Sequence, residues 1–184
     1  MRRTSWMILR QWLLVVLATA ISAALASAET IEFDICDDST VASSRSTPSE
    51  DFTAIDDGSV VRHERTGLEW KRCAQGKEWD DGRCAGEAKQ LTWQEALDRA
   101  DETDMEEWRL PNVKELRSIA ERCNREPAIN RSVFPDTEPE NFWSASPVFD
   151  LTGHAWVVQF DGGGTLRVGH NWEESRVRLV RSKE

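Results

Sequence analysis

The sequence is poor in the residues that bind transition metals. It contains three histidines and four cysteines in 184 residues, and no two cysteines are spaced as Cys-x-x-Cys. Zinc sites are normally built from such pairs or from clustered histidines. We therefore expect neither a metal site nor a resident cofactor.

Basic residues are also in the minority. Three of the 23 Lys and Arg, and none of the 33 Asp and Glu, precede residue 29. Residues 29–184 thus carry 20 basic and 33 acidic side chains, a net charge of −13 with neutral His. Such a surface repels phosphate backbones, which excludes nucleic acid as the expected partner. It also repels polyanionic glycans on average, unless a local basic patch overcomes the repulsion.

Charged residues are missing from Gln11 to Ala28, directly after an Arg-rich start. The small residues Ala26–Ala28 end this stretch. The arrangement predicts a secretory signal peptide over residues 1–28, cleaved between Ala28 and Glu29. The alternative is an uncleaved membrane anchor, because 18 uncharged residues approach the length of a membrane span. Both interpretations place the rest of the chain in the periplasm or outside the cell.

The four cysteines are Cys36, Cys73, Cys84 and Cys123. An even number in an exported chain predicts two disulfides. Cys73–Cys84 is the favoured pair, because it would close the Gly- and Asp-rich loop between them. Cys36–Cys123 follows by elimination and would close a long loop, contributing about 4 kcal/mol in the chain-entropy model.

Strand patterns occur at both ends of the domain that we expect over residues 52–184, after a Ser-, Thr- and Asp-rich extended arm at 29–51. Residues 59–72 predict two strands joined by a turn at Thr66-Gly67, with Leu68 and Trp70 on one face. Residues 154–160 and 165–169 flank Asp161–Gly164, which is a hairpin signal. A last strand at 176–181 is expected to point Val177 and Leu179 inward and Arg178 outward. The early and late strands could pair.

Helix signals lie between these strands. Thr92 and Glu95 form a capping box before an apolar stripe. Asn112 and Glu115 predict the start of a second helix, whose inner stripe comprises Leu116, Ile119, Ala120 and Cys123 and which ends before Pro127. Two helices, short antiparallel sheets and a long loop region after Pro127 indicate an α+β fold.

Seven segments stand in the order and spacing of one known family. They are TGLEWKR, TWQEAL, EWRLPNVKEL, PAIN, FWSAS, AWVVQF and VRLVR. From about Phe52 to Arg181 the chain resembles the Lcl C-terminal domain, which implies a C-type-lectin-like fold and an exported binding module. The family is named for a collagen-like surface adhesin whose C-terminal domain binds host glycosaminoglycans. Here Ala100 and Leu179 stand where many relatives carry cysteines, tyrosine is absent and the surface is acidic, so the fold carries over better than the ligand.

The segment EWRLPNVKEL has a structural interpretation. Trp108 should be buried, Pro111 turns the chain, and Asn112 with Glu115 starts the helix. Arg109 lies between two inward-pointing neighbours, and a partly buried Arg normally needs a carboxylate or several carbonyls. We therefore expect Arg109 to clamp the start of this helix by pairing with an acid or with main-chain carbonyls.

A ligand-binding surface is expected between Phe134 and Trp172, where loops vary over a fixed scaffold. The candidate ligand-binding residues are Glu138, Glu140, Asn141, Arg167, His170 and Trp172. Oxygen ligands at 138–141 and 170–175 could hold calcium, although neither segment matches the calcium motifs of sugar-binding C-type lectins. Trp79 and Trp172 are the better candidates for exposed aromatic residues, whereas Trp70, Trp93, Trp108, Trp143 and Trp156 are expected in the core.

No assembled catalytic site is apparent, so we expect no enzyme and no catalytic residues. The wider fold includes a formylglycine-generating redox enzyme with two reactive cysteines, but disulfides explain the cysteines here better. Glu106 and Glu107 could be paired carboxylates but are more simply solvated, and His63, His154 and His170 are expected at the surface. The predicted function is adhesin-like, non-catalytic recognition of a glycan or protein at the cell envelope, and the prediction allows for an oligomer. The alternative is an assembly module of an envelope complex.

Overall fold

The computed structural model describes residues 45–101, 108–169 and 173–182, all within the unit Asp34–Glu184. Several predicted features lie outside these residues and stay predictions. They are the signal segment with its cleavage site at Ala28 and Glu29, most of the arm, Cys36, Glu106, Glu107, His170 and Trp172.

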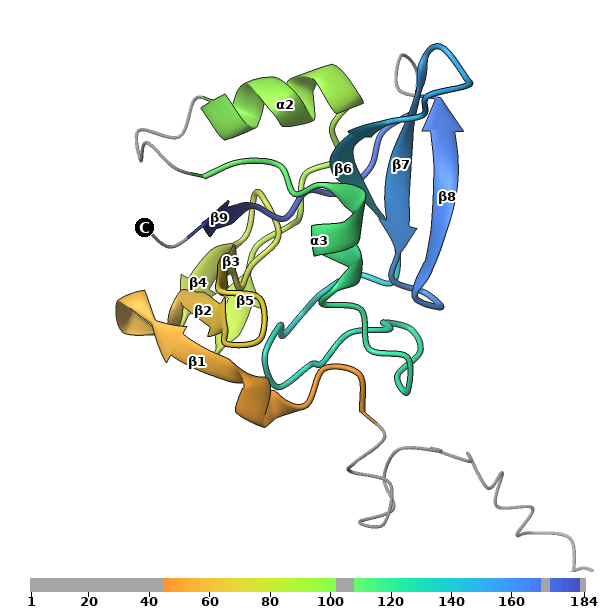
Figure 1. Cartoon of the computed structure of the whole chain (residues 1–184). Helices are drawn as coiled ribbons and strands as arrows, with labels where there is room; N and C mark the ends of the chain where they lie inside the picture. Colours follow the sequence, from red (N-terminus) through yellow and green to blue (C-terminus); the bar gives the residue numbers. More distant parts are fainter. Residues whose placement is uncertain (1–44, 102–107, 170–172, 183–184) are drawn as a thin grey trace, which may run out of the picture. The chain divides into compact units, whose positions relative to one another are not determined.

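Early and late strands share one antiparallel sheet with the strand order β1-β2-β3-β9 (Figure 1). The strands are β1 (Phe52–Ile55), β2 (Val60–His63), β3 (Leu68–Lys71) and β9 (Val180–Ser182). The predicted hairpin is confirmed, with Val61 opposite Trp70. The predicted pairing of early and late strands is confirmed as well, with Trp70 opposite Val180.

A second antiparallel sheet contains β6 (Asn141–Pro147), β7 (His154–Gln159) and β8 (Gly164–Gly169) in that order. The predicted hairpin joins β7 to β8. The strand β6 lies where a loop was expected. Phe142 belongs to one core cluster and Trp143 to another, so β6 is buried on both faces and lacks the alternation of a half-exposed strand.

The stretch closed by Cys73–Cys84 is a hairpin instead of the predicted loop. Strands β4 (Glu78–Asp80) and β5 (Arg83–Ala85) pair antiparallel. The turn between them has φ of 40° at Asp81 and 102° at Gly82. Asp-Gly with positive φ is a hairpin signature, but each strand has three residues and charged side chains, which conceals the strand pattern.

Both helices begin after the predicted caps. Before α2 (Trp93–Asp101), the backbone N–H and hydroxyl of Thr92 donate to the Glu95 carboxylate at 2.8 and 2.7 Å. Before α3 (Val113–Arg117), Asn112 and Glu115 form a complete capping box. The described helices include none with the length and apolar character needed to cross a bilayer. Two short 3-10 segments, η2 (Ser49–Asp51) and η3 (Asp56–Gly58), flank β1.

The prediction that the second helix continues to Cys123 is wrong. The helix α3 ends at Arg117. Beyond it, Ala120 forms a bridge with Ile129, and the Glu121 N–H donates to the carbonyl of Ala128 at 2.9 Å. Pairing with residues 128–129 therefore replaces the helical hydrogen bonds, although the buried positions expected from the apolar stripe are kept at Leu116, Ile119 and Ala120.

Two clusters of buried apolar side chains form the core. The first includes Trp70, Phe134, Phe142, Phe160, the α3 residue Leu116 and Ile119 just after α3; the second includes Trp108, Trp143, Val157, Val177 and the α2 residue Ala96. The core prediction is confirmed for Trp70, Trp108 and Trp143, while Trp93 and Trp156 are half-buried. Large aromatic side chains thus supply much of the buried area.

The last residues of the predicted arm are packed onto the domain. The Glu121 side chain is buried and accepts hydrogen bonds from the backbone N–H groups of Ser46, Thr47 and Cys123 and from both hydroxyls of Ser46 and Thr47. Asn130 adds a bond to the Thr47 carbonyl at 2.9 Å. Because a carboxylate that accepts several bonds is costly to remove from its donors, Glu121 fastens this segment to the fold.

Candidate functional site

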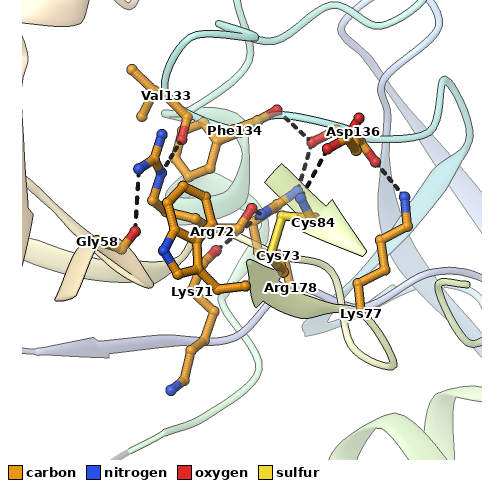
Figure 2. The surroundings of a disulfide bond; sticks show 12 residues. Gly58, Lys71, Arg72, Cys73, Lys77, Cys84, Val133, Phe134, Asp136 and Arg178 are labelled. Atoms are coloured by element: carbon orange, nitrogen blue, oxygen red, sulfur yellow. Dashed lines mark hydrogen bonds between the residues drawn. A yellow bond between two sulfur atoms is a disulfide. The ribbon is translucent and has the colours of Figure 1, made fainter. Parts of the chain in front are cut away.

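The loop from Phe134 to Glu140 begins the predicted recognition segment, and it is tied to the disulfide hairpin (Figure 2). The backbone N–H of Cys84 donates to Asp136 Oδ2 at 2.8 Å. Lys77, between the two cysteines, donates to the Asp136 carbonyl and forms an ion pair with Glu138 Oε1. The disulfide Cys73–Cys84 therefore holds a segment in which the Cys84 backbone and the Lys77 side chain both fix this loop.

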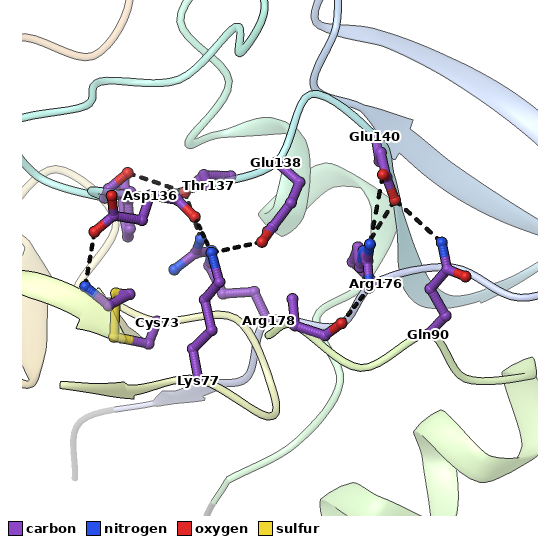
Figure 3. Close-up of polar contacts among 12 residues, drawn as sticks. Cys73, Lys77, Gln90, Asp136, Thr137, Glu138, Glu140, Arg176 and Arg178 are labelled. Carbon is purple, nitrogen blue, oxygen red and sulfur yellow. Dashed lines mark hydrogen bonds and ion pairs between the residues drawn. A yellow bond between two sulfur atoms is a disulfide. The ribbon is translucent and has the colours of Figure 1, made fainter. Parts of the chain in front are cut away.

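Arg178 lies at the centre of this arrangement, with 1% of its surface exposed. Its guanidinium donates to the carbonyls of Lys71 (2.9 Å) and Arg72 and to the Thr137 hydroxyl at 2.7 Å (Figures 2 and 3). It also lies over the Phe134 ring at 4.9 Å. Burial lowers the pKa of Arg178 to about 9, against the opposing influence of a nearby carboxylate, so it remains charged at neutral pH.

The prediction that Arg178 points outward is wrong. It assumed a strand with one face in solvent over residues 176–181. The strand β9 begins only at Val180, and Val177, Arg178 and Leu179 are all buried. Inward and outward alternation does not apply to a segment that is covered on every side, so a buried Arg satisfied by carbonyls takes the position.

A second ion pair fixes the end of the same loop. Arg176 Nε lies 2.9 Å from Glu140 Oε2, and Gln90 donates to the same oxygen at 3.3 Å (Figure 3). The backbone of Arg176 pairs with β6, donating to the Asn141 carbonyl at 2.9 Å. Glu140 and Asn141 are thus fastened to the segment before Arg178.

The four predicted ligand-binding residues that the structure describes, Glu138, Glu140, Asn141 and Arg167, lie in different surroundings. The carboxylates of Glu138 and Glu140 face cations rather than empty space. Arg167 lies on the exposed part of β8, opposite Trp156, and His170 and Trp172 lie outside the described residues. Across residues 45–101, 108–169 and 173–182, no three His, Cys, Asp or Glu side chains are grouped to hold a metal. The two ion pairs shape this loop, and a calcium ion bound by Glu138 or Glu140 would have to displace Lys77 or Arg176.

Trp79 was expected to be exposed in a loop. It lies in β4, half-buried, with the Arg72 guanidinium 4.0 Å from its ring centre. Its Nε1 donates to the Asp57 carbonyl at 3.2 Å. This tryptophan packs the disulfide hairpin against η3, which leaves it little surface for stacking on a ligand.

Arg109 has the acidic partner that its predicted structural role requires. Its guanidinium contacts both Glu115 oxygens, at 2.7 and 2.8 Å, while Glu115 also accepts from the Asn112 N–H at 2.8 Å. Burial opposes ionisation of Glu115, but these bonds outweigh it and lower its pKa.

The neighbours of Arg109 are also fixed by contacts within the domain. Trp108 is buried under Lys71 and Arg181, and the Pro111 carbonyl accepts from the Ala145 N–H at 2.7 Å. From Trp108 to Glu115, the described contacts of this segment build the fold.

Arg109→Lys is expected to destabilise the domain by about 1 kcal/mol, because lysine cannot bond both carboxylate oxygens and the pair is partly solvated. Thermal unfolding followed by circular dichroism measures this loss. An unchanged melting temperature together with a loss of ligand binding would contradict the structural role and move Arg109 to the binding surface.

Besides Arg178, three titratable side chains of the described residues are buried although the sequence does not predict their burial. Glu121 is one. His63, which was expected at the surface, is buried in β2 and stacks on Phe52 at 4.5 Å, and burial lowers its pKa. Glu69 is held between Arg62 and Arg181, directly opposite it on the neighbouring strands. For Glu69 alone a sequence signal exists, since a Glu flanked by Leu68 and Trp70 in a central strand requires a cationic partner.

Large apolar side chains reach the surface mainly on one turn. Phe149, in the connection between β6 and β7, is fully exposed at 105%, and Leu151 is exposed beside it. Hydrogen bonds order this connection: the Val148 N–H donates to the His154 carbonyl at 2.9 Å and the His154 N–H to the Leu151 carbonyl at 3.3 Å. An aromatic ring held on an ordered turn can insert into a partner at small entropic cost.

Comparison with known families agrees with the segment order. Residues 59–181, two thirds of the chain, match the family model of the Lcl C-terminal domain. The matched range begins one residue before β2 and ends in β9, so it contains α2, α3 and the strands β2 to β8, while β1 lies before it. No curated protein matches the chain.

Proposed function

Because this chain belongs to the Lcl C-terminal domain family, we propose that it is an exported, non-catalytic recognition module with a C-type-lectin-like fold. Residues 1–28 are then a signal peptide, residues 29–51 an arm, and residues 52–184 the domain. The disulfide supports export, since such bonds persist in oxidising compartments. The pairing of β3 with β9, with the long loop region between α3 and β6, supports the lectin-like topology.

The observation that carries a binding role is the exposed turn between β6 and β7. Phe149 and Leu151 make no contribution to the core, yet they lie inside the segment proposed for recognition. Exposed aromatic anchors are typical of protein interfaces. Glu138 is paired with Lys77 and Glu140 with Arg176, which disfavours calcium-dependent sugar binding. The acidic net charge disfavours polyanionic glycans. The preferred ligand is therefore a protein at the cell envelope.

Replacing Phe149 by a photoreactive phenylalanine analogue tests this proposal in the native host. Irradiation should crosslink the chain to one envelope protein through position 149. The same analogue at Thr53, an exposed position of β1, is the matched control and should give no such product. A crosslink of equal yield from both positions, or none from position 149, would count against the turn as the contact.

Phe149→Ser should weaken partner binding at least tenfold while leaving the melting temperature unchanged, because a fully exposed ring adds no buried area in the free domain. Calorimetric titration with the crosslinked partner, together with thermal unfolding, measures both quantities. Retained affinity in this variant would contradict the proposed anchor.

A glycan array on the mature domain, with and without chelator, tests whether the ligand is a sugar instead of a protein. Binding that disappears with chelator would replace the protein proposal by calcium-dependent sugar recognition. Co-purification with one protein partner in fixed stoichiometry, with no dissociation of that partner during purification, would instead identify an assembly module of an envelope complex.

A further inference from the structure

The strand β8 (Gly164–Gly169) is an open edge of its sheet. The sheet order is β6-β7-β8, and Figure 1 shows β8 on the outer side of β7. Within the part of the chain that the structure describes, Thr165 to Val168 pair only with β7. One row of main-chain N–H and carbonyl groups is therefore available for pairing with another strand.

The other strand edges are covered or protected. On β6, the Trp143 N–H donates to Arg176 and the Ala145 N–H to Pro111. On β9, Val180 pairs with Arg109. The edge strand β1 has four residues and is flanked by acidic side chains, and the strands β4 and β5 have three residues each, with charges at Glu78 and Asp80 on β4 and at Arg83 on β5. The edge of β8 stands apart because it has six residues and a single charge, at Arg167.

Natural sheets usually protect long free edges with charges, proline or a covering segment. The edge of β8 has neither lysine nor proline, and Leu166 on it is 43% exposed. An antiparallel strand edge can pair with its own copy around a two-fold axis. We propose that two copies of this chain associate through their β8 edges, which joins two three-stranded sheets into one continuous sheet. This inference does not depend on the proposed function.

Symmetry and charge together select a register. A two-fold axis perpendicular to the sheet keeps the faces of both copies aligned, so the axis passes midway between one residue and its copy, which lie directly opposite each other. With Leu166 on the axis, two leucines meet and Arg167 lies opposite Thr165 of the second copy. With Arg167 on the axis, two like charges would lie directly opposite, which is destabilising. The Leu166 register is therefore favoured.

A strand edge buries less area than a standard stable interface, so we expect a dimer that dissociates on dilution. Each copy carries a large negative charge, with 33 acidic and 23 basic residues in the full chain. Repulsion between the copies is screened by salt. Added salt should accordingly strengthen this dimer.

Sedimentation velocity of the mature protein over a wide concentration range tests the proposal. Dimer should increase with concentration and with salt, and Leu166→Lys should abolish it by placing two cations on the axis. The matched control is Thr53→Lys, which adds the same charge to the exposed strand β1 and should leave the dimer unchanged. A monomer at every concentration, or equal loss in both variants, would overturn the proposal.

Cysteine crosslinking tests the register separately. With an added oxidant, Leu166→Cys should form a disulfide-linked dimer, because residues on the axis lie within the reach of a disulfide. Arg167→Cys should not crosslink, because its own copy is displaced along the strand. Efficient crosslinking through position 167 with none through position 166 would overturn the Leu166 register, and crosslinking through neither would count against β8 pairing.

Discussion

Arg178→Met is expected to lower the free energy of unfolding by about 4 kcal/mol. Methionine fills much of the side-chain volume but donates no hydrogen bonds. The carbonyls of Lys71 and Arg72 and the Thr137 hydroxyl would lose their donor in a site that is almost closed to water. Urea denaturation at pH 7 measures the loss as a lower midpoint with an unchanged slope.

Arg83→Met is the matched control. Arg83 also bonds a carboxylate, that of Asp80, but its side chain is 71% exposed. An exposed ion pair of neighbouring residues contributes little, so the urea midpoint should barely move. Similar losses of unfolding free energy in the two variants would contradict the claim that the burial of Arg178 determines its contribution to stability.

Glu121→Gln is expected to cost about 3 kcal/mol at pH 7. The carboxylate accepts bonds from the backbone N–H groups of Ser46, Thr47 and Cys123 and from the hydroxyls of Ser46 and Thr47. Glutamine offers one acceptor oxygen, and its NH₂ group would face donors. The segment from Ser46 should detach before the domain unfolds, which hydrogen exchange of the Thr47 amide reports.

The effect of Glu121 should also depend on pH. Burial opposes its ionisation, but the bonds from Cys123, Thr47 and Ser46 outweigh burial and lower its pKa below the ordinary value. A lowered carboxyl pKa stabilises the fold above the unfolded pKa of about 4.3, and the contribution is lost as pH falls below that value toward the folded pKa. The stability difference between wild type and Glu121→Gln should therefore be full at pH 7 and shrink below about pH 4. A difference that stays constant with pH would contradict an ionised Glu121.

Local signals in the sequence proved reliable. The capping residues Thr92 and Asn112 mark both helix starts, because a cap involves atoms within three residues of one another. The hairpin between β7 and β8 follows from three consecutive glycines. The pair Cys73–Cys84 follows from a short loop in an exported chain. Arg109 requires an acid nearby, and Glu115 is only six residues away.

Features that depend on distant contacts were missed or wrong. Arg178 is buried because segments around Lys71 and Thr137 cover it, and nothing in its own neighbourhood predicts them. The helix α3 stops early because Ile129 pairs with Ala120. The ion pairs of Glu138 with Lys77 and of Glu140 with Arg176 span 61 and 36 residues and were not predicted either. Such partners become visible only when the chain is folded.

The position of β9 has a consequence for the order of folding. Glu69 in β3 depends on Arg181, 112 residues further along the chain, and the strand that bears Arg181 completes the sheet begun by β1. Contacts between residues so far apart form late, because the chain loses much entropy before they contribute. The sheet cannot be completed, nor the charge of Glu69 balanced on both sides, until β9 has been synthesised. The first sheet should therefore stay unfinished until residues 180–182 are available to pair with β3.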